Sequence, residues 1–186
     1  MRVIGGEKGG IRLAGFSGDK IRPTSDKVKG AVFSSLASLV PDYSVFIDLF
    51  AGTGGMGIEA LSRGAEDVRF FDRDRRSIDL VKENLKKTGY DKKARVSTIP
   101  AQRALAQLAD EQVVSDIIFM DPPYKDVPAS LALFETISHL GLLSGEGVIV
   151  LEHDKSDIIP SEVSDFVKIR EKTYGKTVIS IFRGRE

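Results

Sequence analysis

Short continuous apolar runs alternate along the chain with segments in which apolar residues recur every three or four positions. The first pattern is typical of buried strands and the second of amphipathic helices. The runs predict strands over 45–50, 67–72, 95–98, 116–121, 147–152, 166–172 and 177–183, and the spaced segments predict helices over 57–63, 75–87, 102–108 and 129–140. Strands that alternate with helices predict an α/β fold with a mostly parallel sheet, and the last two runs predict an antiparallel hairpin at its edge.

The first 44 residues follow a different pattern. Residues 3–6 and 10–13 are short apolar runs joined by a glycine-rich turn, which predicts a hairpin. Apolar positions from Val28 to Leu39 then have helical spacing, with Thr24 or Ser25 as the predicted N-cap. The sequence therefore predicts one globular domain in two parts, a hairpin-and-helix extension over 1–44 and an α/β core over 45–186.

Composition is ordinary for a globular protein and argues against several classes. No apolar stretch approaches the roughly 18 residues of a membrane span, and the first residues lack the apolar core of a secretion signal. The absence of cysteine excludes disulfides and thiolate metal sites, and we expect no metal and a cytoplasmic location.

The net charge is zero, but it is unevenly distributed. Residues 1–30 and 168–186 each carry a balance of +4, and the segment between them carries −8. Basic ends on an acidic body can present a positive face to phosphates. Ordinary scatter of surface charge explains the same numbers equally well.

A glycine-rich turn follows the first strand of the predicted core. Residues 52–57 contain the G-x-G-x-x-G spacing, in which a tight backbone turn lets an adenosine-bearing cofactor approach. Asp72, at the end of the next strand, is placed to accept both ribose hydroxyls. Asp48, just before the glycines, can bind a cationic group such as the ammonium of S-adenosylmethionine. Taken alone, Asp48 could instead anchor the loop amides, and Asp72 could be a solvated acid beside Arg73.

The tetrapeptide Asp121-Pro122-Pro123-Tyr124 ends the strand over 116–121. Ligands of open parallel sheets bind beyond the carboxyl ends of the strands, so we expect this turn at the same edge as the glycines. The Asp121 carboxylate and the Pro122 carbonyl can accept the two hydrogens of an exocyclic base amine, which orients the nitrogen lone pair toward a methyl sulfonium. Tyr124 can stack on an unpaired base. The alternative is a plain turn, since two prolines mark loops in any case.

With both motifs, the chain resembles the RsmD-type methyltransferases, which modify the N2 of a guanine in bacterial small-subunit (16S) ribosomal RNA. The segment 22–29 is the most specific mark, and matching segments cover 2–6, 10–13, 48–54, 59–64 and 121–124. The resemblance implies a class I S-adenosylmethionine-dependent methyltransferase fold, a Rossmann-like seven-stranded sheet with an antiparallel edge hairpin. The implied partner is ribosomal RNA, naked or within a partly assembled small subunit. We expect a monomer and no membrane partner.

The motifs and the resemblance together give three sets of candidate residues. The predicted cofactor-binding residues are Asp48, Gly52, Thr53, Gly54, Asp72, Arg73, Ala101, Gln102 and Asp121. The predicted catalytic residues are Asp121, Pro122, Pro123 and Tyr124. The predicted RNA-binding residues are Arg2, Arg12, Arg22, Thr24 and Lys27, although Arg22 could equally be a surface residue before a capped helix.

One position departs from the pattern of related enzymes. They often carry an acidic or amide residue at the end of the third strand, where this chain has Pro100. Recognition of adenine is therefore assigned to backbone groups near Ala101 and Gln102, or to the Gln102 amide.

Three other functions account for part of the sequence. A DNA adenine or cytosine amino-methyltransferase shares the Asp-Pro-Pro-Tyr turn, but such enzymes usually need additional sequence to read a site in the groove. An NAD-dependent oxidoreductase would use the glycine turn but leaves 121–124 without a role, and we predict that His139 and His153, which show no obvious partner, are structural. A non-catalytic RNA-binding module would bind no cofactor.

Overall fold

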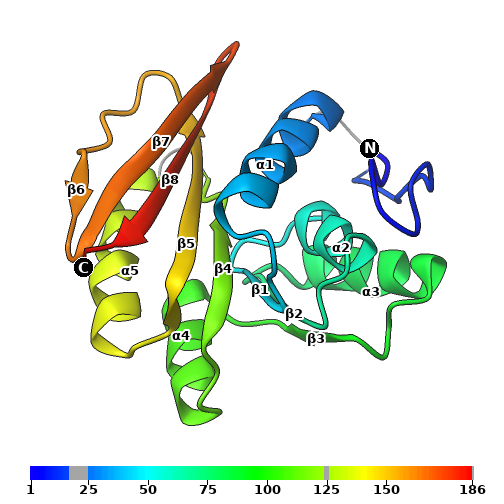
Figure 1. Cartoon of the computed structure of the whole chain (residues 1–186). Coiled ribbons are helices and arrows are strands. Elements are labelled where there is room, and N and C mark those ends of the chain that lie inside the picture. The colour runs from blue at the N-terminus through cyan, green and yellow to red at the C-terminus, as the bar shows by residue number, and fades with distance from the viewer. Residues whose placement is uncertain (17–24, 124–125, 186) are drawn as a thin grey trace.

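A computed structural model describes residues 1–16, 25–123 and 126–185. They form one eight-stranded sheet of order β3-β2-β1-β4-β5-β8-β7-β6, flanked by five helices (Figure 1). The strands are β1 (Val45–Asp48), β2 (Asp67–Phe71), β3 (Ala94–Ser97), β4 (Ser115–Met120), β5 (Leu143–Asp154), β6 (Glu162–Val163), β7 (Phe166–Tyr174) and β8 (Thr177–Gly184). The helices are α1 (Asp26–Leu39), α2 (Gly55–Ser62), α3 (Arg75–Thr88), α4 (Ala101–Asp110) and α5 (Val127–His139).

The sheet is parallel from β3 to β5 and antiparallel from β5 to β6. The predicted alternation of strands and helices and the closing hairpin are therefore confirmed. The expected number of strands was one too few, because β6 was missed. This strand has two residues, paired with Val167 and Phe166, and two residues are too few to show the alternation that marks a strand in a sequence.

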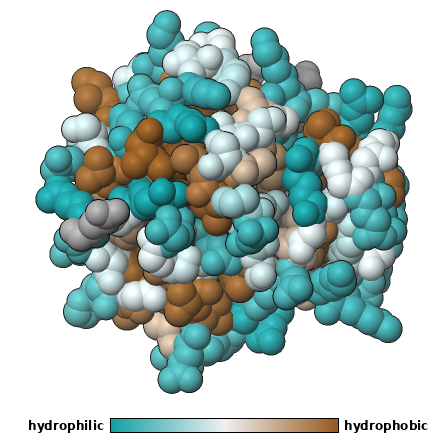
Figure 2. All heavy atoms as spheres, viewed as in Figure 1, coloured by the Kyte–Doolittle hydropathy of each residue, from teal (hydrophilic) through white to brown (hydrophobic). Residues whose placement is uncertain are grey.

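Alternating side chains divide the core into two layers. Phe46 and Phe119 face α1, α2 and α3, whereas Ile47 and Ile118 face α4 and α5. Both layers consist of buried aliphatic and aromatic side chains. Hydrophilic residues cover most of the face seen in Figure 2. No helix among the described residues is long and apolar enough to cross a membrane.

Three helix ends follow the expected local rules. Of the two predicted N-caps of α1, Ser25 is the one that accepts a hydrogen bond, from Val28 N at 3.3 Å, and Thr24 lies outside the described residues. Asp74 accepts from Arg76 N at 2.9 Å at the start of α3, and Gly89 ends that helix with a φ of 77°. Capping therefore sets where α3 begins, directly after the end of β2.

The predicted N-terminal hairpin is confirmed as a tight reversal with one antiparallel bridge, between Arg2 and Arg12. Val3 N donates to Ile11 O at 2.9 Å. Val3 and Leu13 are buried in the same core layer as α1, α2 and α3, so the hairpin packs directly on the α/β core.

A buried ion network anchors this hairpin to α2. The Glu59 carboxylate, which has no exposed surface, accepts from Ile4 N at 2.7 Å and from Gly5 N at 2.8 Å. It also accepts from Arg63 Nε at 2.9 Å and lies 3.5 Å from the fully buried Lys29 ammonium. Burial lowers the pKa of Lys29, and the nearby Glu59 charge opposes that shift. The network joins α1, α2 and the N-terminal hairpin into one body.

Candidate active site

The loop between β1 and α2 is tied to the strands on either side of β1. Leu49 N donates to Phe119 O at 3.1 Å, and Ala51 N donates to Phe71 O at 3.0 Å. Gly52 has a φ of 53°, in the left-handed region that favours glycine, and a Cβ built there meets no atom of the described residues within 4 Å. Among the described residues nothing covers this side of the loop, which is compatible with the predicted approach of a cofactor.

The other glycines of the loop serve the packing of α2. Gly54 is the N-cap of α2 and has a φ of 78°. A Cβ at Gly57 would lie 2.3 Å from the Phe70 ring, so only glycine allows α2 to pack this closely on β2.

The glycine loop and the proline turn lie at the same edge of the sheet. β1 and β4 are neighbouring parallel strands, in which Asp48 pairs with Phe119. Asp121 follows Phe119 by two residues, so its side chain points to the same face as Asp48. The hydrogen bond from Leu49 N to Phe119 O joins the two segments directly. The expectation that both motifs meet at one edge is confirmed.

Asp48 is buried without a hydrogen-bond partner. Its side chain is 1% exposed, and among the described residues neither carboxylate oxygen has a partner. Burial raises the pKa of Asp48 to about 7, and the charge of Asp72 acts in the same direction. The backbone amides of Gly57 and Phe50 favour the charged form but do not reach hydrogen-bonding geometry. A buried carboxylate without partners is costly, and a bound cation would relieve that cost.

Two further carboxylates adjoin Asp48. The register of β4 and β5, in which Met120 pairs with Leu151, sets Asp121 beside Glu152 on the face that Asp48 also occupies. Burial raises the pKa of Asp121 well above its ordinary value, and the charges of Glu152 and Asp48 add to the shift. We call Asp48, Asp121 and Glu152 the carboxylate cluster. Its chemistry suits a positively charged ligand.

Sequence reasoning missed Glu152, although a signal was present. Like Asp48 and Asp121, it is an acid directly after a continuous run of buried apolar strand residues. In a parallel sheet such an acid lies at the ligand-binding edge.

Asp72 lies beside the open side of the loop but already holds two amides. One carboxylate oxygen accepts from Gly52 N at 2.9 Å and the other from Asp74 N at 2.8 Å. Each oxygen has a second lone pair with which to accept a hydroxyl. Asp72 is therefore both an anchor of the loop and a candidate acceptor for a ribose. Its neighbour Arg73 is 70% exposed and lies 3.4 Å from Asp126.

The start of α4 lies at the same edge, after β3. Pro100 is its N-cap and makes no side-chain capping bond, so the first amides of α4 are not satisfied by a cap. Ala101 is buried and Gln102 is exposed. The position fits the expected use of backbone groups or of the Gln102 amide for adenine, which stays a prediction.

Thr53 is tied to the protein interior. Its hydroxyl lies 3.8 Å from the Met1 sulfur, and its carbonyl accepts from Asn84 Nδ2 at 2.9 Å. Asn84 also accepts from Ala14 N at 2.7 Å and donates to Ala14 O at 3.0 Å. Asn84 thus fixes both the loop and the N-terminal segment. Sequence reasoning missed it, although a polar residue between Val81 and Leu85 on an apolar helix face was a signal.

The remaining candidates are less closely grouped. In the proline turn, Pro122 is buried, while the exposed Pro123 accepts from Asp126 N at 2.7 Å. Tyr124, Arg22 and Thr24 lie outside the described residues. His153, for which the sequence suggested no partner, lies 2.9 Å from Ser180 Oγ.

The described candidates for RNA contact are all exposed. Arg2 lies 3.0 Å from Asp26, at the start of α1, and Arg12 is opposite Arg2 in the hairpin. Lys27 is in the first turn of α1. The three cations therefore belong to the hairpin and the adjoining helix start.

Comparisons with known proteins agree with this arrangement. The family model described as conserved hypothetical protein 95 matches residues 1–183. A candidate rRNA methyltransferase of Bacillus subtilis (strain 168), YlbH, is 43% identical over 185 residues and covers 100% of both chains. Ribosomal RNA small subunit methyltransferase D of Escherichia coli (strain K12) is 31% identical, over 98% of this chain and 89% of its own.

Solved structures show the same fold. A hypothetical protein of Thermus thermophilus is 29% identical with a TM-score of 0.83, over 97% of this chain and 98% of its own. An RNA methyltransferase from Salinibacter ruber, solved in complex with S-adenosyl-L-homocysteine, is 15% identical with a TM-score of 0.61, over 89% of this chain and 95% of its own. The expected class I methyltransferase fold is therefore confirmed.

Proposed function

Because this chain belongs to the RsmD-type family, we propose that it transfers the methyl group of S-adenosylmethionine to the exocyclic N2 amine of a guanine in small-subunit (16S) ribosomal RNA. One observation carries the proposal: the glycine loop and Asp121 lie at one edge of the sheet, beside the buried Asp48 carboxylate, for which the described residues supply no hydrogen-bond partner.

The residues at this edge fit S-adenosylmethionine. Asp72 accepts the ribose hydroxyls, and the first residues of α4, Ala101 and Gln102, contact the adenine. The buried Asp48 carboxylate binds the ammonium directly or through water. When bound, the cofactor supplies an electrophilic methyl on a cationic sulfur, and the carboxylate cluster favours that charge at this edge.

The proline turn holds the amine that receives the methyl. Asp121 and the Pro122 carbonyl accept its two hydrogens, which orients the lone pair of the nitrogen along the line of transfer. The raised pKa of Asp121 also suits this carboxylate to take the proton that the amine releases. Tyr124 provides a face on which the base stacks.

The basic N-terminal segment is the proposed contact with the rest of the RNA. Arg2, Arg12, Arg22, Thr24 and Lys27 belong to it, and their contribution is to affinity and orientation through phosphates rather than to base choice. We propose that a cytoplasmic monomer acts on naked RNA or on a partly assembled subunit.

The product of the reaction tests the proposed function. Purified protein is incubated with labelled S-adenosylmethionine and either naked small-subunit RNA, partly assembled subunits or duplex DNA. Nucleosides are then identified by mass spectrometry. We expect label in N2-methylguanosine from an RNA substrate. Label in N6-methyladenine or N4-methylcytosine of DNA would assign the rival function, and binding of NAD in place of S-adenosylmethionine would overturn the proposal.

Replacing Asp72 with alanine is expected to weaken S-adenosylmethionine binding about 10- to 100-fold, because hydrogen bonds from the ribose to a charged acceptor are lost together with the anchor of Gly52. Isothermal titration calorimetry measures the change. Asp79→Ala, an exposed acid on α3, is the matched control and should bind normally. Unchanged affinity in the Asp72 variant would remove this residue from the ribose role.

Replacing Asp48 with asparagine is expected to stabilise the protein without cofactor while weakening cofactor binding. The pKa of Asp48 rises from 3.8 to about 7 on folding, so between these values the folded protein holds a proton that the unfolded chain has released. Stability therefore falls as pH rises through this window, and the cost is complete above pH 7. At pH 8 the variant should gain on the order of 1–3 kcal/mol, and near pH 3 it should gain nothing.

Thermal melts at several pH values, without and with S-adenosylmethionine, check this behaviour. The wild type should gain more stability from the cofactor than Asp48→Asn does. A variant that loses stability at pH 8, or that binds the cofactor with unchanged affinity, would contradict the role given to Asp48.

A further inference from the structure

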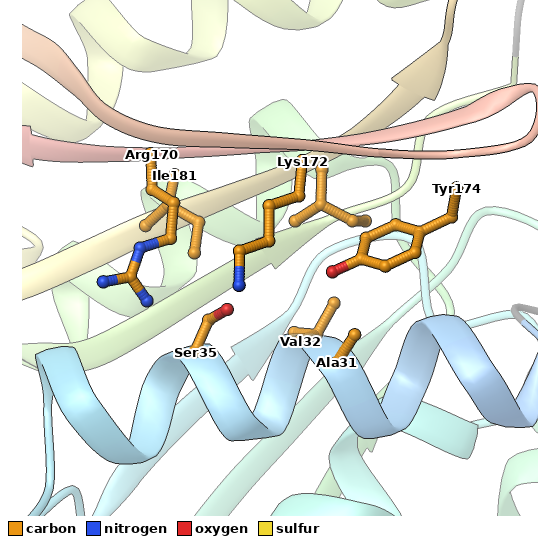
Figure 3. Close-up of a pocket in the computed structure, with 8 residues that line it drawn as sticks. Ala31, Val32, Ser35, Arg170, Lys172, Tyr174 and Ile181 are labelled. Carbon is orange, nitrogen blue, oxygen red and sulfur yellow. The ribbon is translucent and has the colours of Figure 1, made fainter.

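A groove between α1 and β7 is not explained by the proposed cofactor and base sites. It is a shallow surface depression that opens to solvent and encloses no cavity of its own. Its lining residues are Ala31, Val32 and Ser35 of α1, Arg170, Lys172 and Tyr174 of β7, and Ile179 and Ile181 of β8 (Figure 3). The two β8 residues, Val32 and Ser35 are buried and form the floor, while Arg170, Lys172 and Tyr174 lie toward the solvent side.

A shift in strand register directs the β7 side chains into this groove. The pairing of β7 with β8 slips between Lys168 and Arg170, and after the slip Arg170, Lys172 and Tyr174 all face α1. Figure 3 shows the three side chains extending from β7 toward the helix. The small α1 residues opposite them, Ala31 and Ser35, leave the space open.

The groove is basic. No acidic residue lines it, and among the described residues neither Arg170 nor Lys172 forms an ion pair. Arg170 Nη1 donates to Ser38 Oγ at 3.1 Å, which orients the guanidinium along α1, while Lys172 is exposed. Two cations without counter-charges, beside the Ser35 hydroxyl and the Tyr174 ring, form a surface suited to phosphate groups.

The sheet register connects this groove to the carboxylate cluster. Glu152 of β5 pairs with Ile179 of β8, and Ile179 pairs with Lys172 of β7. Residues paired in this way share one face of the sheet, and two strand spacings separate Lys172 from Glu152 by about 10 Å. Tyr174, at the end of β7, lies further toward the edge that holds Asp121. The groove therefore leads along the sheet to the proposed methylation site.

We propose that the groove between α1 and β7 binds the phosphodiester backbone of the RNA strand that carries the target base. The inference rests on the proposed function and adds a contact surface to it. The carboxylate cluster repels phosphates, so a strand that enters this edge needs cations nearby to hold its backbone. Arg170 and Lys172 supply them, with Ser35 as a further donor, and Tyr174 offers a stacking face for a neighbouring base.

Salt-dependent RNA binding tests the groove. The variants are Lys172→Ala, Arg170→Ala and the double variant, with Lys87→Ala as control; Lys87 is an exposed lysine in the last turn of α3. Binding to a small-subunit RNA fragment is measured by fluorescence anisotropy at several salt concentrations. The double variant should bind roughly tenfold more weakly at low salt, and its salt slope should fall by about 0.7 to 0.9 for each lost phosphate contact. The control should match the wild type.

Further measurements separate this inference from folding defects and from the proposed function. Lys172→Arg should restore binding and Lys172→Glu should weaken it further, while melting temperature and S-adenosylmethionine affinity stay unchanged.

An unaltered salt slope in the double variant, with RNA methylation intact in the wild type, would overturn the proposed role of the groove and leave the proposed function standing. If the double variant bound naked RNA normally but bound assembled subunits more weakly, the groove would be assigned to a protein partner and the RNA contact would be overturned. A wild type that binds the cofactor but methylates no RNA would instead refute the proposed function.

Discussion

Replacing Asp121 with alanine is expected to lower the rate of methyl transfer at saturating substrate by at least about 100-fold, the scale of losing one group that contacts the reacting atoms. Asp121 is the proposed acceptor for the amine and for the proton that it releases. The adenosine contacts come from other elements, so the affinity for S-adenosylmethionine should change only a few-fold. Single-turnover methylation of small-subunit RNA measures the transfer step, and calorimetry measures cofactor binding.

The stability of the same variant distinguishes catalytic loss from unfolding. Burial and the charges of Glu152 and Asp48 raise the pKa of Asp121, so ionised Asp121 destabilises the folded protein near neutral pH. Asp121→Ala should therefore melt no lower than the wild type. Asp110→Ala, at the end of α4, is the control and should keep full activity. A fully active Asp121→Ala protein would refute the base-holding role.

Replacing Glu59 with alanine is expected to lower the free energy of unfolding by about 3–5 kcal/mol. The change leaves the Lys29 ammonium, which has no exposed surface, without its counter-charge, and it removes the acceptor for Ile4 N and Gly5 N. For a chain of this size such a loss lowers the melting temperature on the order of 10 °C. Urea unfolding followed by circular dichroism measures the effect.

A double variant without either charge separates the cost of the unpaired ammonium from the cost of lost packing. Lys29→Met with Glu59→Gln removes both charges while keeping similar volumes, so the double variant should recover much of the stability lost in Glu59→Ala. Proteolysis should cut the N-terminal hairpin faster in Glu59→Ala than in the wild type. A loss below about 1 kcal/mol, which is typical of an exposed pair, would show that the network does not anchor the hairpin.

Much of this fold could be predicted because most of its strands are continuous apolar runs and its helices repeat apolar residues every three or four positions. The position of Asp48 and Asp121 at one edge of the sheet was predicted by the same reasoning, since Asp48 ends one buried strand and Asp121 directly follows another. β6 escaped prediction because two residues carry no periodic signal. Glu59 and Asn84 were missed because their partners, Ile4 and Ala14, lie 55 and 70 residues away in the sequence.

Some predictions about the site depended on side-chain direction, which a sequence pattern does not give. Thr53 belongs to the glycine loop, yet its hydroxyl lies against Met1. Asp72 lies where a ribose acceptor was expected, yet it also holds the amides of Gly52 and Asp74. The groove beside Arg170 and Lys172 depends on a register slip in β7, a feature that composition and periodicity do not reveal.

A crystal structure of this protein with S-adenosylhomocysteine tests the central claim most directly, namely that the glycine loop and the proline turn form one site. We expect the ribose at Asp72, the amino group at Asp48 and the sulfur facing Asp121 across the carboxylate cluster. A ligand bound away from the loop, or one whose sulfur lies on the side of the loop remote from Asp121, would contradict the account.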